Sequence, residues 1–358
     1  MRAVGVFPVA REVRLVEHPE PSVSFSHELK LRLLEVGVCG TDRALCGFEF
    51  GAAPEGCDYF ILGHESVAEV VDAGDEVISF RPGDLVVGAV RQPCGDAGCV
   101  PCGAGRQDFC ATGRYRERGI VRMHGYMTDF VIEEDRFVCA VPQNLRDVAV
   151  LIEPLTIAEK ALFEFQAIDA RLPWPKDHRT AAVLGAGPVG LLGAMLFRNR
   201  GFETWVYSRS RAPNPKAAIV EAIGAHYVSS METPPREFAR LVGNIDLVYE
   251  AMGAPQAAFD VLQYLGANGV CIFTGVPSSA ERPTLDVPRL LLHMIMRNQV
   301  VVGTVNAGPD AFEAAIRDLA GFHARWPQAL SGMISGRYPI GAFHQAIYDP
   351  GIKNVIRL

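Results

Sequence analysis

The chain has 358 residues, of which 49% are hydrophobic and 21% are charged, and its formal net charge is −7. This length favours two domains that each bury a core of their own. The negative charge argues against a surface that neutralises nucleic-acid phosphates. No apolar run approaches the length of about 18 residues that a membrane span needs, and the opening MRAVGVFPVA lacks the apolar core of a secretory signal. We therefore expect a cytoplasmic protein that binds neither nucleic acid nor membrane.

The first 150 residues or so consist of short β-rich runs broken by glycine and proline. These runs include LKLRLLEVGV, SVAEVVDAG, DLVVGAV and DFVIEEDRFVCAVP. Such regular spacing of short strands and turns predicts a compact domain that resembles a β-barrel.

Four of the nine cysteines fall within 17 residues, on a glycine-rich segment inside this β-rich region. They are Cys94, Cys99, Cys102 and Cys110, with the spacing C-x4-C-x2-C-x7-C. In a reducing compartment such a cluster indicates a metal more often than disulfides. Four converging thiolates predict a closed, tetrahedral zinc site that stabilises its segment and leaves no position for a substrate. The wide first spacing leaves the geometry at Cys94 less defined than at the other three.

A second metal site is predicted from residues that lie far apart. Cys39 follows an apolar strand in VGVCGTD, His64 stands in ILGHESVAEV, and Glu153 stands in LIEPLTIAEKA. Together they offer three ligands and leave one position open, which is the arrangement of a catalytic zinc. We therefore expect two zinc ions per chain.

After about residue 150 short apolar strands alternate with stretches of helix length, which predicts a doubly wound parallel sheet. The strand AAVL is followed by GAGPVG and an apolar helix, so Gly185, Gly187 and Gly190, with Pro188 and Val189 between them, form a G-x-G-x-x-G turn. This strand-to-helix turn lets the backbone approach a dinucleotide pyrophosphate at the helix N-terminus.

The strand that follows this turn favours NADP over NAD. NAD sites place an acidic residue here for the ribose hydroxyls, whereas TWVYSRSR supplies Ser208, Arg209 and Arg211. A guanidinium can bind a 2′-phosphate with two hydrogen bonds. Two solvated surface arginines remain the alternative, and use of both cofactors stays open.

In this order and at these separations, VCGTD, GHE, the four-cysteine segment and GAGPVG resemble the zinc-containing medium-chain dehydrogenase/reductases, the superfamily of alcohol, sorbitol and threonine dehydrogenases. The resemblance implies a GroES-like catalytic domain built from residues 1–154 and 305–358. A Rossmann dinucleotide-binding domain, residues 155–304, is inserted between these parts. It also implies a homodimer or homotetramer that associates through the edge of the Rossmann sheet.

Within this superfamily the chain is most similar to the microbial glucose dehydrogenases. Glu153 stands where ordinary alcohol dehydrogenases have a cysteine, Glu117 stands where the sugar enzymes use a glutamate, and Val305-Asn306 matches the pair that they present to nicotinamide and sugar. The resemblance implies oxidation of an aldose such as glucose at C1, with NADP as acceptor and a lactone as product. Glu117 and Asn306 would bind sugar hydroxyls.

The same resemblance assigns Thr41 to pass on the substrate proton and Glu65 to act as an alternative ligand or a base. Two positions depart from the pattern. Ala44 replaces the histidine that ends the proton relay in many alcohol dehydrogenases, and Ile157 replaces an aspartate that binds a hydroxyl in some sugar enzymes. Proton release must then use water or an acidic group.

Several alternatives remain at this point. The enzyme could be a polyol, secondary-alcohol or aminocyclitol dehydrogenase, or the chain could be a non-catalytic dinucleotide-binding homologue, because a fold does not fix a function. Glu65 could only orient His64, and Thr41 could only cap a helix. Glu117 could form a surface ion pair, and Asn306 could only close a turn.

Overall fold

A computed structural model describes residues 1–174, 177–277 and 282–358 of the chain. The polypeptide divides into two compact units. The first unit contains residues 1–156, 306–323 and 334–358, and the second contains residues 157–305 and 324–333. None of the helices in the described ranges combines the length and the hydropathy of a membrane-spanning segment. The predicted loop LPWPKDHRT lies partly outside the described residues, since 175–176 belong to it.

The first unit consists mostly of short strands. Its strands are β1 (Arg2–Phe7), β2 (Glu12–Glu17), β3 (Glu28–Gly37), β4 (Phe60–Ile61), β5 (Glu65–Ala73), β6 (Leu85–Gly88), β7 (Arg91–Gln92), β8 (Arg116–Arg118), β9 (Arg122–Met123), β10 (Phe130–Glu134), β11 (Val138–Ala140), β18 (Ile334–Pro339) and β19 (Lys353–Arg357). Its helices are α1 (Gly40–Cys46), α2 (Val100–Gly103), most of α9 (Pro309–Arg325) and α11 (Phe343–Tyr348), with single 3₁₀ turns at Gln107–Phe109, Asp135–Phe137, Gln143–Leu145, Ala149–Leu151 and Ile340–Ala342.

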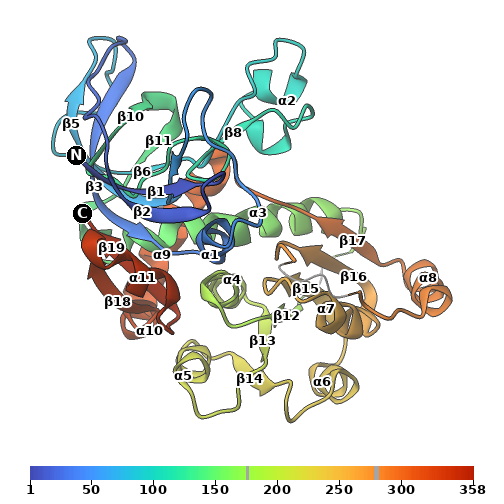
Figure 1. Cartoon of the computed structure of the whole chain (residues 1–358). Helices are drawn as coiled ribbons and strands as arrows, with labels where there is room; N and C mark the ends of the chain where they lie inside the picture. Colours follow the sequence, from blue (N-terminus) through green and yellow to red (C-terminus); the bar gives the residue numbers. More distant parts are fainter. Residues whose placement is uncertain (175–176, 278–281) are drawn as a thin grey trace. The chain divides into compact units, whose positions relative to one another are not determined.

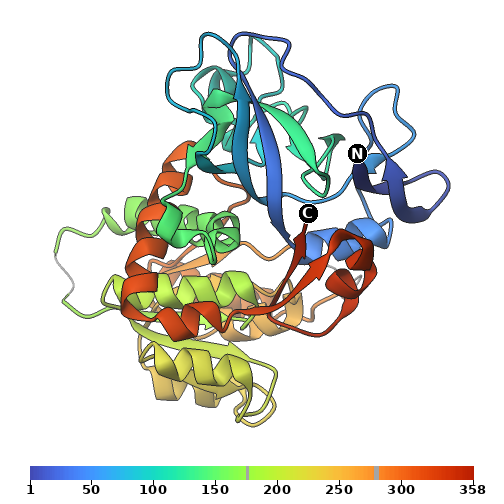
Figure 2. The ribbon, with the colours of Figure 1, turned by 90° about the vertical axis from the view of Figure 1, so that its left-hand side faces the viewer.

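The largest sheet of this unit joins segments from both parts of the chain. Its strand order is β11-β6-β5-β3-β19-β18, and β10 also pairs with β3. Strand β19 is antiparallel to β3, with Val355 opposite Gly37 and Arg357 opposite Glu35, and Figure 2 shows the two strands side by side. A three-stranded sheet, β2-β1-β4, shares the apolar core of this unit, which includes Val4, Leu31 and Phe60.

The second unit is a six-stranded parallel sheet with helices on both faces. It contains α3 (Ile152–Asp169, from Ile157 on), β12 (Thr180–Leu184), α4 (Pro188–Asn199), β13 (Glu203–Ser208), α5 (Pro215–Ala222), β14 (His226–Ser229), α6 (Pro235–Val242), β15 (Ile245–Glu250), α7 (Pro255–Leu262), β16 (Leu265–Phe273), α8 (Val287–Met296), β17 (Val300–Gly303) and α10 (Pro327–Ser331). The strand order is β14-β13-β12-β15-β16-β17. Helices α4 and α5 lie on one side of the sheet, and α6 and α7 lie on the other (Figure 1).

The structure agrees with the predicted fold class, because a domain of short strands accompanies a doubly wound parallel sheet. The sheet order reverses between β12 and β15, and ligands of such sheets bind at the carboxyl ends of the strands beside this switch point. The first turn of the second unit, residues 185–190, lies at this edge, because it directly follows β12.

Candidate active site and metal centres

The four cysteines of the glycine-rich segment converge on one point. The sulfur atoms of Cys94, Cys99, Cys102 and Cys110 all lie within 4.8 Å of one another, and those of Cys99 and Cys110 are 4.0 Å apart. Tetrahedral zinc with Zn–S bonds of about 2.3 Å needs sulfur atoms about 3.8 Å apart. The geometry and the soft donor set therefore fit the predicted structural zinc. We call residues 94–110 the cysteine lobe.

A second group of metal-binding side chains gathers in the first unit. The thiol of Cys39, the imidazole of His64 and the carboxylate of Glu65 bring one ligand atom each to within 4.8 Å of the others. Cys39 immediately precedes α1, while His64 and Glu65 lie where β5 begins. His64 and Glu65 are buried, at 4% and 1% exposure. We call these three residues the buried cluster.

Asp42 orients the buried cluster. Its carboxylate accepts a hydrogen bond from the backbone N–H of Cys39 (2.8 Å), and its other oxygen lies 3.5 Å from Nδ1 of His64. A histidine that binds a metal through Nε2 usually turns its Nδ1–H to such a carboxylate. Burial alone lowers the pKa of His64, but Asp42 and Cys39 outweigh it and hold that pKa well above its ordinary range. Asp42 and Cys39 thus favour a positive charge beside the imidazole of His64.

Lys353 of β19 reaches the same cluster from the far end of the chain. Its Nζ donates to both carboxylate oxygens of Glu65, at 2.7 and 2.5 Å, and to the carbonyl of Val38 at 3.1 Å. Both side chains of the ion pair are 1% exposed. Burial lowers the pKa of Lys353, but Glu65 outweighs this and raises it. The ammonium therefore compensates one of the negative charges buried here.

Glu153, the third ligand predicted from the sequence, stands beside this group but outside it. Its carboxylate is not among the ligand atoms that lie within 4.8 Å of one another. Burial raises the pKa of Glu153 to about 7, His64 opposes that shift, and Glu65 adds to it. The carboxylate thus interacts electrostatically with the cluster, and the structure groups Glu65 more tightly with Cys39 and His64. A thiolate, an imidazole and a carboxylate are ligands that suit zinc.

Thr41 does not cap helix α1, because the N-cap residue is Cys39 and Thr41 lies in the first turn. The alternative that Thr41 serves only as a cap is therefore wrong. In the described part of the chain its hydroxyl has no hydrogen-bond partner, and its side chain is partly exposed. The hydroxyl is available to a ligand.

The glycine turn of the second unit has the backbone that its sequence predicts. Gly185 has φ of +104°, which favours glycine. A Cβ on Gly190 would lie 2.1 Å from the carbonyl oxygen of Gly185, whereas a Cβ on Gly187 would meet nothing within 4 Å. Gly190 therefore permits close packing of strand and helix. Gly187 keeps the open side of the turn clear for a phosphate.

Glu250, at the carboxyl end of β15, fixes the two loops next to this turn. Its carboxylate accepts hydrogen bonds from the backbone N–H groups of Met252 (2.9 Å), Gly253 (2.7 Å) and Gly275 (3.1 Å). Met252 would also contact a Cβ placed on Gly185, at 3.0 Å. This buried acid shapes the switch point of the sheet.

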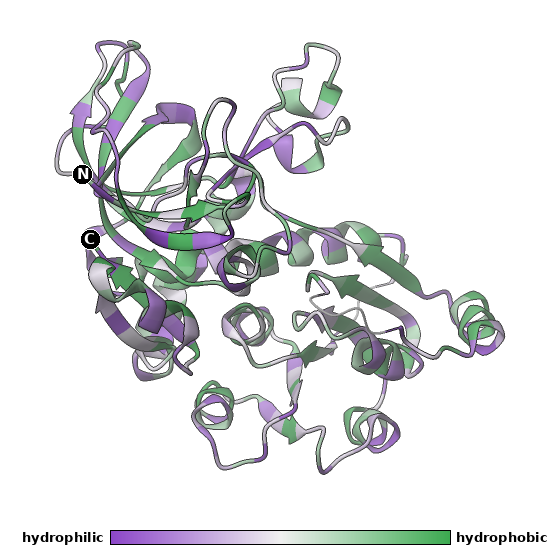
Figure 3. Ribbon diagram, viewed as in Figure 1, coloured by the Kyte–Doolittle hydropathy of each residue, from purple (hydrophilic) through white to green (hydrophobic). Residues whose placement is uncertain are grey.

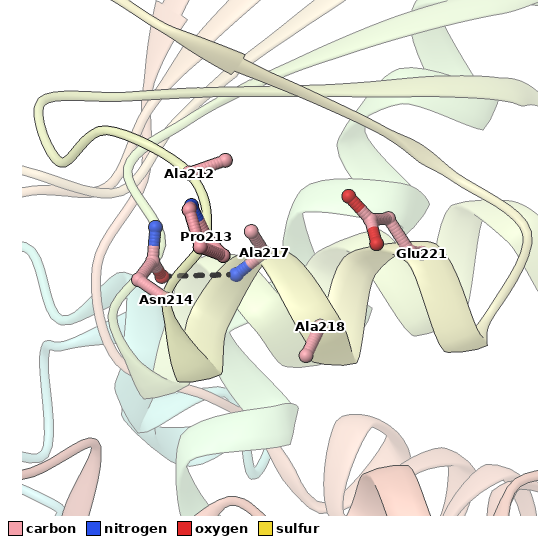
Figure 4. A pocket seen from close by; sticks show the side chains of 6 residues that line it. All are labelled: Ala212, Pro213, Asn214, Ala217, Ala218 and Glu221. Carbon is pink, nitrogen blue, oxygen red and sulfur yellow. Dashed lines mark hydrogen bonds between the residues drawn. The ribbon is translucent and has the colours of Figure 1, made fainter.

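The loop after β13 carries the residues that favour NADP. Arg209 and Arg211 are exposed, and the guanidinium of Arg211 lies 3.7 Å from Glu232, so a solvated ion pair accounts for part of its environment. The next residues of this loop and the first turns of α5 line a pocket of about 300 Å³. Its lining residues are Ala212, Pro213, Asn214, Ala217, Ala218 and Glu221 (Figure 4). This lining contains a carboxylate and no cation, so the pocket itself does not suit a phosphate.

Glu117 and Asn306, which are 189 residues apart, meet in the first unit. The side-chain amide of Asn306 donates to Oε1 of Glu117 at 3.0 Å, and Asn306 has φ of +60°. Its own side-chain oxygen accepts the N–H of Ala307 at 2.8 Å. The neighbouring Val305, in the second unit, is 52% exposed, and its carbonyl accepts a hydrogen bond from Lys160 at 3.0 Å.

Comparison with known proteins agrees with this geometry. Residues 26–143 match the alcohol dehydrogenase GroES-like domain, and residues 146–358 match the family described as glucose dehydrogenase C-terminus. The glucose 1-dehydrogenase of Methanocella arvoryzae is 38% identical over 94% of this chain and 93% of its own length. That of Thermoproteus tenax is 41% identical over 89% and 88%.

The chain belongs to the glucose dehydrogenase family of zinc-dependent medium-chain dehydrogenases. A solved structure described as Haloferax mediterranei glucose dehydrogenase in complex with NADP, Zn and gluconolactone superposes with a TM-score of 0.91 at 33% identity, covering 100% of this chain and 99% of that one. The predicted family is thereby confirmed.

Four charged residues that position groups of the site were not predicted from the sequence: Asp42, Lys353, Glu250 and Arg91, whose Nε donates to Oε1 of Glu117 at 2.9 Å. Asp42 had a signal, because it stands three residues after Cys39 in the VCGTD motif and can therefore reach the backbone of Cys39. The others are isolated charged residues without a local pattern. Only the folded chain brings them to their partners.

Proposed function

We propose that the protein is a zinc-dependent glucose 1-dehydrogenase that takes a hydride from C1 of an aldose, with glucose as the natural candidate. NADP⁺ accepts the hydride, and the sugar leaves as an aldonolactone while one proton is released. The observation that carries the proposal is the buried cluster of Cys39, His64 and Glu65 with Asp42 behind it. The named relatives and the complex with NADP, Zn and gluconolactone support the same substrate and cofactor.

Cys39 and His64 are the proposed holders of the catalytic zinc, with Glu65 or Glu153 as the third ligand. When bound, zinc supplies Lewis-acid stabilisation of the oxygen that loses its proton. The hydroxyl of Thr41 is the proposed first acceptor of that proton. Ala44 offers no group to continue the relay, so the proton must pass to water or to an acidic side chain. Cys94, Cys99, Cys102 and Cys110 would hold the second, structural zinc.

Glu117 and Asn306 are the proposed contacts for sugar hydroxyls, since a polyol is recognised by several directed donors and acceptors. The turn 185–190 would bind the pyrophosphate of the cofactor. Ser208, Arg209 and Arg211 would surround the 2′-phosphate, and Val305-Asn306 would border the nicotinamide. We assign residues 1–154 and 305–358 to the catalytic domain and residues 155–304 to the dinucleotide-binding domain.

An activity assay with NADP and a panel of aldoses, polyols and secondary alcohols tests this function. We expect an aldose to have the largest kcat/KM and its lactone to be the product. Rapid turnover of a secondary alcohol without turnover of any aldose would instead favour the alternative alcohol dehydrogenase. Zinc analysis separates both from a non-catalytic homologue, for which the two expected zinc ions per chain would be reduced to one or none.

The cofactor assignment has a test of its own. Replacing Arg209 and Arg211 together by alanine removes two cations from an exposed loop. We expect the KM for NADP to rise by about tenfold or more, because a charged hydrogen bond contributes about 1.5–3 kcal/mol. The KM for NAD should not change, and an equal rise for both cofactors would contradict the assignment.

We further propose that two copies associate through one edge of the Rossmann sheet. Strand β17 is the last strand of that sheet, so its outer edge has no neighbouring strand in the described residues. Helix α8 precedes it and exposes Leu292 (57%), Ile295 (73%) and Met296 (72%), and Figure 3 shows its apolar colouring. An open edge next to an apolar helix fits a two-fold interface in which equivalent strands pair. Wild type should therefore sediment at about twice its 38.9 kDa, and Leu292→Asp/Ile295→Asp should be monomeric.

The cytoplasm is the proposed compartment, and carbohydrate oxidation the proposed physiological context. All nine cysteines are free thiols, and five of them belong to the two groups of candidate metal ligands. Such thiols are maintained in a reducing environment.

A further inference from the structure

Arg91 is a buried cation that lies directly against Glu117. The two residues face each other in the register between β7 and β8. Nε and Nη2 of Arg91 both lie 2.9 Å from Oε1 of Glu117. Arg91 is 5% exposed and Glu117 is 7% exposed. The pair is therefore largely buried, unlike the surface ion pair that the sequence left open.

Two further contacts fix the orientation of the arginine. Nη1 donates to the carbonyl of Asp108 in the cysteine lobe at 3.2 Å. The guanidinium also stacks on the ring of Tyr115, with its carbon 3.7 Å from the ring centroid. A planar guanidinium can make these contacts simultaneously, whereas a lysine ammonium cannot.

The hydrogen bonds of Glu117 are distributed unequally between its two oxygens. Oε1 accepts hydrogen bonds from the guanidinium of Arg91 and from the side-chain amide of Asn306. Oε2 has no hydrogen-bond partner among residues 1–174, 177–277 and 282–358, and it is not one of the enclosed polar atoms, so solvent reaches it. One oxygen is thus saturated by the protein while the other remains available as an acceptor.

We infer that Arg91 is a positioning residue for the sugar, which acts by holding Glu117 with Oε2 directed to a substrate hydroxyl. The inference rests on the proposed function. The guanidinium supplies the opposite charge that a buried carboxylate needs. An ionised carboxylate only accepts hydrogen bonds, so the site selects ligands that present a hydroxyl to Oε2. Asn306, from a distant part of the sequence, donates to the same Oε1 and thereby also holds the carboxylate of Glu117 in this orientation.

Steady-state kinetics of Arg91→Met, Arg91→Lys, Glu117→Gln and the Arg91→Met/Glu117→Gln double variant test the inference. We expect Arg91→Met to raise the KM for glucose by about 10- to 100-fold, the loss of one charged hydrogen bond. The KM for NADP and the zinc content should not change, and kcat should change by less than about threefold. Arg91→Lys should recover only a small part of the affinity. In the Glu117→Gln background, Arg91→Met should raise the KM for glucose no further.

Arg116→Met is the matched control, because Arg116 lies next to Glu117 on β8 but pairs with Gln92 (3.0 Å) and is exposed. It should keep the wild-type KM for glucose. Deoxyglucoses supply a readout that a purely structural role would not change. Wild type should discriminate against the one that lacks the hydroxyl bound by Oε2, and Arg91→Met should lose that discrimination.

Two results would overturn the role of Arg91: an unchanged KM for glucose in a folded Arg91→Met protein, or additive effects of the two substitutions. If Arg91→Met does not fold, Arg91→Lys is judged by the same KM ratio. A wild type that oxidises no aldose contradicts the proposed function before any variant is compared. An active wild type with an insensitive Arg91→Met rejects only the role of Arg91.

Discussion

The cysteine lobe and the buried cluster both gather metal ligands, but they are built in opposite ways. The lobe draws its four thiols from residues 94–110; Cys102 lies in the four-residue helix α2, and the other three lie in the loops around it. In the buried cluster, Cys39 immediately precedes α1, His64 immediately precedes β5, and Glu65 begins β5, while Lys353 pairs with Glu65 across 288 residues. A local site can form when a loop closes, whereas the buried cluster needs the finished sheet. We therefore expect the lobe metal to support stability and the cluster to support chemistry.

The sharpest test of this division is the substitution Cys39→Ala. It removes a ligand whose only replacement would be water, and we expect kcat/KM to fall by about 10³-fold or more, because metal stabilisation contributes several kcal/mol to the transition state. The zinc content should fall from two to one per chain. Cys139→Ala, a thiol outside both groups, is the control and should remain active. If Cys39→Ala kept more than a tenth of the wild-type kcat/KM, the buried cluster would not be the site that supports catalysis.

The substitution Lys353→Met should have the next largest effect, which is a decrease in the free energy of unfolding. The substitution leaves Glu65 as a buried carboxylate without its counter-ion, which costs about 3–5 kcal/mol. Urea unfolding of the chelator-treated protein measures the change without interference from the metal. Adding Glu65→Gln should recover part of the loss. A change below about 1 kcal/mol would mean that the ion pair contributes little.

Cys99→Ser tests the other half of the comparison. Loss of one thiolate should release the lobe metal and lower the free energy of unfolding by about 2–4 kcal/mol, since metal binding is coupled to the folding of the segment that holds it. Zinc at the buried cluster should remain, and the KM for NADP should not change. Thermal unfolding and zinc analysis of the same sample measure both effects. Loss of both zinc ions together would show that the two sites depend on each other.

A smaller effect comes from a histidine outside both groups. Nδ1 of His124 accepts the N–H of Ile61 at 3.1 Å, and burial, together with His18 and Arg118, lowers the pKa of His124 to about 4. The unfolded chain binds a proton near pH 6.5, while the folded chain does so only near pH 4. Stability is therefore complete above pH 6.5 and declines as the pH falls towards 4.

We expect this histidine to account for about 1–2 kcal/mol of the acid lability, after a discount for its partial exposure. His124→Asn preserves an acceptor for Ile61 and does not titrate. The variant should therefore lose less stability than wild type between pH 6.5 and pH 4 in urea titrations. Equal losses would attribute the acid lability to the metal-binding groups instead.

The same difference in construction explains what could be predicted from the sequence. The lobe is predictable because its spacing is contained in 17 residues, and the glycine turn is predictable because strand, turn and helix are consecutive. The resemblance named Glu117 and Asn306 as candidate sugar contacts, but it did not predict the hydrogen bond between them, since the two residues are 189 positions apart. Lys353, Arg91 and Glu250 had no signal, because an isolated charged residue does not indicate which distant group it will meet. Their roles depend on register between strands.

The position of β19 also has a consequence for how the chain is made. Lys353 is translated 288 residues after the glutamate that it neutralises, and residues 35–37 of β3, which pair with β5 on one side, have no partner strand on the other side until β19 pairs with them. While the ribosome synthesises the Rossmann segment, the earlier β-rich segment keeps an open strand edge and an uncompensated buried acid. The second unit contains its own complete sheet and can close first. Folding would then proceed against the direction of synthesis, and the oldest part of the polypeptide would be the last to reach its native form.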